Sequence, residues 1–155
     1  MAKIIHGERI GKTAALRTGC SAVIWDETHT RILLTRRTDN GQWCLPGGAT
    51  DPGENVEETC IREMLEETGL AVKVTKLIGI YSSPDYIVEY ADGNRWQIIS
   101  LTFEAEVVGG QLGLSDETTE VGYFTPAEIE TMDVMEHHFT RISDALLKRD
   151  TPFIR

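Results

Sequence analysis

The sequence predicts an α/β fold, a sandwich built around a mixed β-sheet. Segments with the composition of strands outnumber those with helical periodicity. One strongly amphipathic helix in the middle of the chain has an apolar face that needs a sheet to cover it. The 155 residues contain no repeat, low-complexity tract or linker, and this length suits one domain. We therefore expect a single domain over residues 1–155.

The first third of the chain is expected to supply strands. Residues 1–16 suit a short strand or arm, and two further strands are predicted at 20–25 and 31–34, joined by a turn-forming run at 26–30. Arg36 follows the second strand. It is either part of a solvated loop or a contact for a substrate phosphate, since a guanidinium fork matches phosphate geometry.

The central helix is predicted over residues 55–69. Asn55 is a good N-cap, and Glu58 three residues later completes a capping-box-like pair. Gly69 suits a left-handed C-cap. One broad apolar face is expected to consist of Val56, Cys60, Ile61, Met64 and Leu65.

The second half is predicted to alternate strands and turns before it ends in helices. Strands are expected at 71–81, 86–90, 96–107 and 121–124. Asp92 and Gly93 favour a hairpin turn, and residues 109–120 indicate a polar loop. Thr125 and Pro126 begin a helix, and an amphipathic one follows over 135–147.

Two adjacent histidines, His137 and His138, lie on the last predicted helix. Neighbouring residues on a helix point in different directions, so we expect that they do not share a face. Neither belongs to an HExxH motif, and we interpret both as surface or packing residues.

Negative charge is concentrated on and before the central helix. Seven carboxylates lie between Asp51 and Gly69, offset only by Arg62, so this segment carries −6 of the formal net charge of −10. Glu63, Glu66 and Glu67 have i, i+3, i+4 spacing and project together, although like charges at this spacing repel. Spacing alone leaves two alternatives open, a solvated helix face and a site for a hard cation such as Mg²⁺.

Residues 48–70, GATDPGENVEETCIREMLEETGL, resemble the Nudix box, G-x5-E-x7-R-E-U-x-E-E-x-G-U with U aliphatic. Every fixed or restricted position is met, by Gly48, Glu54, Arg62, Glu63, Met64, Glu66, Glu67, Gly69 and Leu70. The resemblance implies an αβα sandwich with a mixed β-sheet, in which the box forms a loop, a helix and a loop.

The resemblance also implies roles for individual residues. Mg²⁺, or Mn²⁺, would be held by the Gly48 carbonyl and by the carboxylates of Glu63, Glu66, Glu67 and the downstream acid Glu120. Arg62 would orient these ligands by pairing with Glu54 or Glu66. The general base is left open between Glu63 in the box and Glu120 or Glu117 on the later loop; we favour Glu120, because full-time coordination of metal makes Glu63 a poorer base.

The function implied is hydrolysis of a pyrophosphate bond in a nucleoside diphosphate linked to another moiety, by metal-activated water. Pro84 resembles members that hydrolyse ADP-ribose, whereas Tyr86 resembles those acting on dinucleoside polyphosphates, so the markers conflict. Tyr86 could stack on the substrate base, or it could be an ordinary strand residue. The alternative is a non-catalytic nucleotide-binding or regulatory module on the same fold.

Composition and charge limit the kinds of molecule that we expect the protein to bind. A net charge of −10 disfavours long nucleic acid but not a small nucleotide bound through a metal. No apolar run approaches a membrane span, and the N-terminus lacks a signal peptide's apolar core, so we expect a cytoplasmic protein. The three cysteines are expected to be reduced. Similar proteins are often homodimers, and we expect residues 95–107 to offer an apolar edge or face for pairing.

Overall fold

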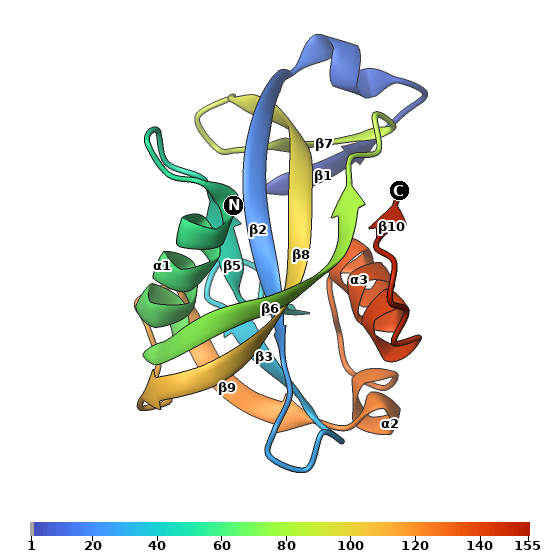
Figure 1. Cartoon of the computed structure of the whole chain (residues 1–155). Helices are drawn as coiled ribbons and strands as arrows, with labels where there is room; N and C mark the ends of the chain where they lie inside the picture. The colour runs from blue at the N-terminus through green and yellow to red at the C-terminus, as the bar shows by residue number, and fades with distance from the viewer. Residues whose placement is uncertain (1) are drawn as a thin grey trace.

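The computed structural model describes residues 2–155 and has helices on both sides of two β-sheets (Figure 1). Seven strands form the larger sheet: β1 (Lys3–His6), β2 (Ala15–Ile24), β5 (Gly47–Ala49), β6 (Leu70–Tyr81), β7 (Tyr86–Glu89), β8 (Arg95–Gly110) and β10 (Phe153–Ile154). Three form the smaller one: β3 (Ile32–Arg37), β4 (Trp43–Cys44) and β9 (Thr118–Phe124). The helices are η1 (Ile10–Thr13), α1 (Val56–Thr68), α2 (Pro126–Ile129) and α3 (Glu136–Leu146).

The larger sheet is organised on β8, its longest strand. β2 runs parallel to β8 over ten residue pairs, from Ala15 and Trp96 to Ile24 and Ala105. β6 and β7 both pair antiparallel with β8, and β10 extends β6 in parallel. The sheet is therefore mixed, as predicted. β8 is an interior strand, because β2, β6 and β7 pair along its edges, so residues 95–107 do not offer a free edge for pairing. A homodimer formed through a face of this strand stays a prediction.

The helix α1 forms as its sequence signals predict. The Asn55 side chain accepts a hydrogen bond from the Glu58 amide, the Glu58 carboxylate accepts one from the Asn55 amide, and Gly69 closes the helix with φ of 74°. Cys60 and Met64 are fully buried against Cys20 of β2 and Phe103 of β8.

The buried face of α1 is narrower than its periodicity indicates. Ile61 is 37% exposed and Leu65 is 54% exposed. Both lie at the margin of the apolar stripe, where the sheet no longer covers them. On the other side, α3 buries Ile142 and Ala145 against Val23, Leu34 and Ile78, so the two helices enclose the strands.

Several elements differ from the sequence-based prediction. β2 begins at Ala15 rather than at residue 20, and β9 begins at Thr118, inside the predicted polar loop. The two-residue strands β4 and β10 and the three-residue β5 were not predicted, because such short strands are fixed by their neighbours rather than by local pattern. None of the helices formed by residues 2–155 has the length and apolar character to cross a bilayer.

Met64 and Leu65 give a test of how α1 is held. We expect Met64→Ala to lower the free energy of unfolding by about 2–5 kcal/mol, because a fully buried side chain leaves a cavity. Leu65→Ala, one residue away and more than half exposed, should cost less than about 1 kcal/mol. Urea unfolding of both variants measures the difference, and equal losses would contradict this packing.

Candidate active site

The acidic helix meets the larger sheet at two glycines. Gly48 of β5 pairs with Cys20 of β2, and Gly47 pairs with Ser21. A methyl group on Gly47 would collide with the Cys20 carbonyl, and one on Gly48 would collide with the Glu63 carboxylate. The close backbone contact between β5 and β2 therefore requires glycine at position 47, whereas at Gly48 the end of the flexible Glu63 side chain lies directly against the backbone of β5. The Gly47 amide also donates a hydrogen bond of 2.9 Å to Glu67.

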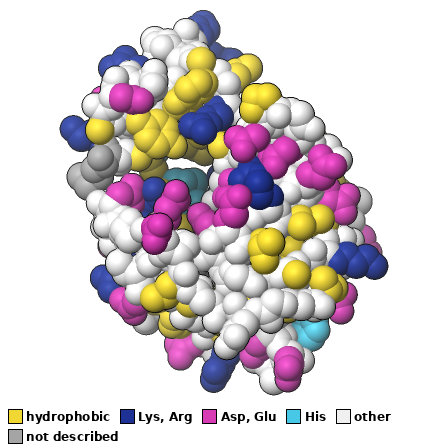
Figure 2. Space-filling model, turned by 90° about the vertical axis from the view of Figure 1, so that its left-hand side faces the viewer, with side chains coloured by type: hydrophobic (Ala, Val, Ile, Leu, Met, Phe, Trp, Pro, Cys, Tyr) yellow, Lys and Arg dark blue, Asp and Glu magenta, His cyan; other side chains and the backbone are white. Residues whose placement is uncertain are grey.

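Arg62 holds the acidic groups together. Its Nε and Nη2 donate to the two oxygens of Glu54 at 2.5 and 2.9 Å, a two-pronged contact. Nη1 donates to Glu63 at 2.8 Å and to Glu66 at 3.2 Å, and Nη2 also reaches the Ala49 carbonyl at 3.0 Å. One guanidinium thus ties the loop before α1 to two carboxylates on it. Figure 2 shows acidic side chains gathered around a basic one on the face that carries α1.

The electrostatics of the carboxylates differ with their surroundings. Hydrogen bonds from Arg62 lower the pKa of Glu54 to about 2, and these bonds raise the pKa of Arg62 in turn. Burial raises the pKa of Glu63, and the hydrogen bond and positive charge of Arg62 partly offset this rise. Burial also raises the pKa of Glu67 to about 7, against the opposing effect of the Gly47 amide. A nearby cation would favour the charged forms of Glu63 and Glu67.

The donor set fits a hard divalent cation. Glu63, Glu66 and Glu67 supply carboxylate oxygens, the ligands that Mg²⁺ prefers, on the same side of α1 as the backbone of Gly48. Across residues 2–155, no three His, Cys, Asp or Glu side chains already converge as a preformed metal site. Glu63 and Glu66 are instead turned toward Arg62, and Glu67 toward the Gly47 amide, so sharing one ion requires these side chains to rotate.

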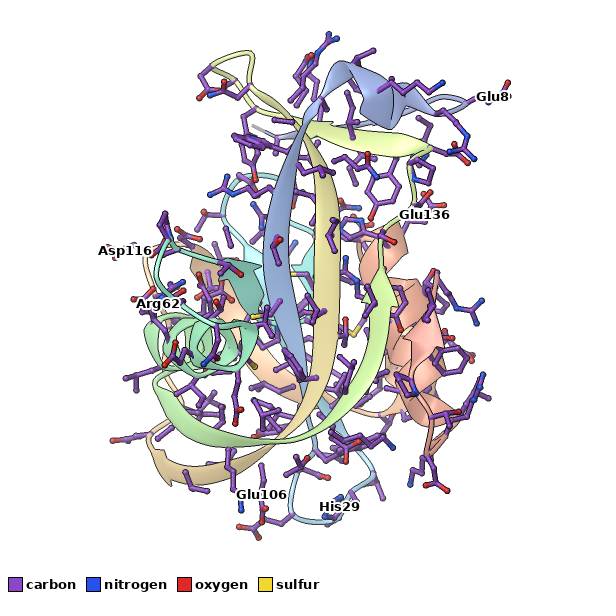
Figure 3. All side chains as sticks on the ribbon, turned by 45° about the horizontal axis from the view of Figure 1, so that its top comes forward. Glu8, His29, Arg62, Glu106, Asp116 and Glu136 are labelled. Atoms are coloured by element: carbon purple, nitrogen blue, oxygen red, sulfur yellow. The ribbon has the colours of Figure 1, made fainter. Side chains whose placement is uncertain are left out.

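A cavity of about 140 Å³ opens beside the acidic helix. Gly47, Glu67 and Glu117 line one side, and Tyr86, His137 and Arg141 line the other. The first group comes from β5, α1 and the loop before β9, whereas the second comes from β7 and α3. Figure 3 shows Asp116, next to Glu117, on the α1 side of the molecule, and Glu136, next to His137, across the central strands. The cavity therefore has an acidic wall and a wall rich in aromatic and basic groups.

Two of the predicted site residues, the substrate contact Arg36 and the acid Glu120, do not line this cavity. The two residues face each other across β3 and β9 and form an ion pair at 2.5 Å, while Arg36 Nε donates to the Gly41 carbonyl at 2.8 Å. The cavity lining includes Glu117 and Thr118, but neither Glu120 nor Arg36. The charge of Glu117 acts on both Glu63 and Glu67. Of the two downstream acids, Glu117 is the one beside the candidate ligands.

Tyr86 and the two histidines are brought together. The ring of Tyr86 stacks on His137 at 5.9 Å and 29°, and the rings of His137 and His138 are 4.6 Å apart. Both histidines line the cavity, although they are neighbours in the sequence of α3. They lie in the first turn of α3, which abuts the cavity, and His138 Nδ1 accepts a hydrogen bond from the Leu45 amide at 3.2 Å.

Both histidines are neutral at physiological pH. Burial lowers the pKa of His137 to about 3 and the pKa of His138 well below its ordinary value, and the charge of Arg141 adds to both shifts. Arg141 was not singled out from the sequence. Its spacing of i+4 from His137 was the available signal, because this spacing places both side chains on one face of a helix.

Comparisons with known proteins agree with the box. A family model described as the NUDIX domain matches residues 15–144. An ADP-ribose pyrophosphatase of Methanocaldococcus jannaschii is 43% identical over 101 residues, which cover 63% of this chain and 56% of that protein. A putative 8-oxo-dGTP diphosphatase of Bacillus subtilis is 36% identical over 104 residues, covering 67% and 62%. The matched region thus spans little more than half of these relatives' own lengths.

Solved structures show the same fold. A NUDIX hydrolase from Nitrosomonas europaea is 25% identical with a TM-score of 0.70, covering 89% of this chain and 93% of that one. The MutT protein from Methanosarcina mazei Go1 is 26% identical with a TM-score of 0.67, covering 88% and 95%.

The Arg62 contacts predict a pH-dependent contribution to stability. The pKa of Glu54 in the folded protein, about 2, lies below its ordinary value of 4.5, so the pairing stabilises the fold above about pH 4.5 and is lost as the pH falls toward 2. We therefore expect Arg62→Gln to be less stable than the wild type at pH 7, with a gap that narrows between pH 4.5 and 2. Urea unfolding across this range measures it.

The control is Arg95→Gln, which breaks the Arg95–Glu89 ion pair far along the sheet. The difference in stability between Arg95→Gln and the wild type should not narrow in the same way between pH 4.5 and 2. A stability gap for Arg62→Gln that stays constant down to pH 2 would contradict the role of Glu54.

Proposed function

The chain belongs to the Nudix family, and from this premise we propose that it hydrolyses a pyrophosphate bond in a nucleoside diphosphate linked to another moiety. The observation that carries the proposal is the group of carboxylates held by Arg62 next to Gly48, where Gly47, Gly48 and Glu67 line a cavity that Tyr86, His137 and Arg141 also line. We also propose that the protein requires Mg²⁺ or Mn²⁺. The relatives' names support a nucleotide substrate, since they include ADP-ribose and 8-oxo-dGTP hydrolases.

The site must overcome repulsion between a polyanionic substrate and a hydroxide-like nucleophile. A bound divalent cation would neutralise the phosphates and lower the pKa of the attacking water. Glu63, Glu66, Glu67 and the Gly48 carbonyl would hold it. Arg62 acts by positioning, since its contacts with Glu54 and the Ala49 carbonyl fix the guanidinium that orients Glu63 and Glu66.

We propose Glu117 as the general base, in place of Glu120. Glu117 lines the cavity, is exposed, and lies on the loop that ends where β9 begins at Thr118. Its backbone carbonyl accepts a hydrogen bond from the Thr38 amide, which fixes the loop while the side chain stays free to approach a water. Glu120 is paired with Arg36, and this pair secures β3 to β9. Tyr86 is proposed to contact the substrate from this cavity, where its ring packs against that of His137.

Metal dependence is the direct test. We expect hydrolysis of ADP-ribose or nucleoside triphosphates with Mg²⁺, release of a nucleoside monophosphate, and loss of turnover in excess chelator. Loss of a residue that only supports a metal ligand lowers activity by about 10- to 100-fold. Glu66 is proposed as a ligand itself, so we expect Glu66→Gln to lower kcat by more than about 100-fold. Its side chain is 59% exposed, so the fold should be retained.

Glu57→Gln is the matched control, an exposed acid in the first turn of the same helix. It should keep its activity. Nucleotide binding without turnover in the wild type would instead favour the non-catalytic module, and full turnover in chelator would exclude the metal.

A second test separates the candidate bases. Glu117→Gln should lower kcat by about 10²–10⁴-fold at saturating Mg²⁺ and remove the acidic limb of the pH–rate profile, because proton abstraction is lost. Glu120→Gln should change kcat far less. If Glu120→Gln lowers kcat more than Glu117→Gln does, Glu120 is the base. If only Glu63→Gln alters the pH–rate profile, the base is Glu63.

A further inference from the structure

Arg141 is a buried cation that forms no ion pair among the described residues, and its guanidinium lies near the Tyr86 hydroxyl. Its residue is 4% exposed, and its Nε has no hydrogen-bond partner among residues 2–155. Its guanidinium lies over the ring of Tyr81 at 5.5 Å. By contrast, Arg37 in the same cavity makes a two-pronged contact with Asp39 at 2.8 and 2.9 Å. A buried charge is costly unless it is paired, so Arg141 requires an explanation.

The nearest acid on α3 cannot serve as its partner. Asp144, three residues along the helix, accepts hydrogen bonds from Arg155 at 2.8 and 3.0 Å and from the Tyr81 hydroxyl at 2.9 Å. Burial lowers the pKa of Arg141, and the phenols of Tyr86 and Tyr81 offset this only in part. The carboxylates of the acidic wall lie on the other side of the cavity.

A second unpartnered group lies beside Arg141. Nδ1 of His137 is buried and has no hydrogen-bond partner in the described part of the chain. His137 and Arg141 are four residues apart on α3, and both line the candidate active-site cavity and a second cavity of about 190 Å³. Stacking on Tyr86 fixes the ring of His137. Two unsatisfied polar atoms on one helix face therefore point to a ligand.

The hydrogen-bonding chemistry of Arg141 and His137 indicates which class of ligand they suit. A guanidinium and a neutral imidazole can both donate hydrogen bonds, which suits a compact group of oxygen atoms with negative charge. An uncharged sugar would leave the guanidinium without a counterion. The metal ligands already account for the pyrophosphate that is cleaved, so the group at Arg141 is an additional one.

We infer that Arg141 and His137 form a subsite for a phosphoryl group that lies beyond the scissile pyrophosphate. This inference rests on the proposed function and narrows its substrate class. It selects nucleoside triphosphates over ADP-ribose, because only the triphosphate carries such a group. Arg141 then contacts substrate at the end remote from the acidic helix.

Kinetics on two substrates test the subsite. We expect Arg141→Gln to lower kcat/KM for ATP by roughly 10- to 100-fold, mainly through KM, since a hydrogen bond to a charged group is lost. For ADP-ribose the fall should be less than about threefold. Arg141→Lys should recover part of the loss on ATP. Equal losses on both substrates, or none on ATP, would overturn the inference.

The control is Arg149→Gln, an exposed arginine just beyond α3 whose Nη2 donates to Thr151. It should behave as the wild type on both substrates. If Arg141→Gln does not fold, His137→Phe serves instead, because it keeps a ring against Tyr86 and removes Nδ1. This variant should also lose kcat/KM selectively for ATP, and an unselective effect would count against the subsite.

A binding measurement separates this inference from the proposed function. Calorimetric titration with inorganic tripolyphosphate and with pyrophosphate, both in chelator, isolates metal-independent anion binding. We expect the wild type to prefer tripolyphosphate and Arg141→Gln to lose that preference. If no nucleotide is hydrolysed but this difference persists, only the proposed function fails; if hydrolysis occurs without the difference, only the subsite fails.

Discussion

The structure depends on one guanidinium that holds like charges together. Glu63, Glu66 and Glu67 repel one another on α1, and Glu54 adds a further charge just before the helix. Arg62 reaches three of these four acids and the Ala49 carbonyl, and it is the only base in the segment from Asp51 to Gly69. Since the same residue joins the loop to the helix, the geometry of the carboxylates and the path of the chain into α1 are fixed together.

The opposite face of α1 explains how this charge is tolerated. Cys60 and Met64 bury fully against β2 and β8, and this apolar contact holds the helix on the sheet whatever the state of the acids. The helix also approaches β5 closely enough to lay the Glu63 carboxylate against Gly48 and to bring Glu67 to the Gly47 amide. The position of α1 on the sheet therefore both buries its apolar face and places its carboxylates next to β5.

The parts of the site that the sequence predicts are those with local causes. The caps of α1, its acidic spacing and the Asp92-Gly93 turn depend on residues a few positions apart, and all three agree with the structure. The placement of Glu117 and Glu120 depends on where β9 begins. Because the strand starts at Thr118, Glu120 is fixed opposite Arg36, while Glu117 remains at the loop end beside the cavity. No local pattern marks that boundary.

The sequence singles out Tyr86 as a possible substrate contact, but for the same reason it does not show that Tyr86 meets His137 and Arg141. Tyr86, His137 and Arg141 come from β7 and α3, which meet only after the sheet and the C-terminal helix have packed. The acidic helix belongs to one short motif, whereas the residues that we propose to contact the remote end of a substrate come from elements far along the chain. On this proposal the box supplies the chemistry and Arg141 the choice of nucleotide, so the family alone does not decide the substrate.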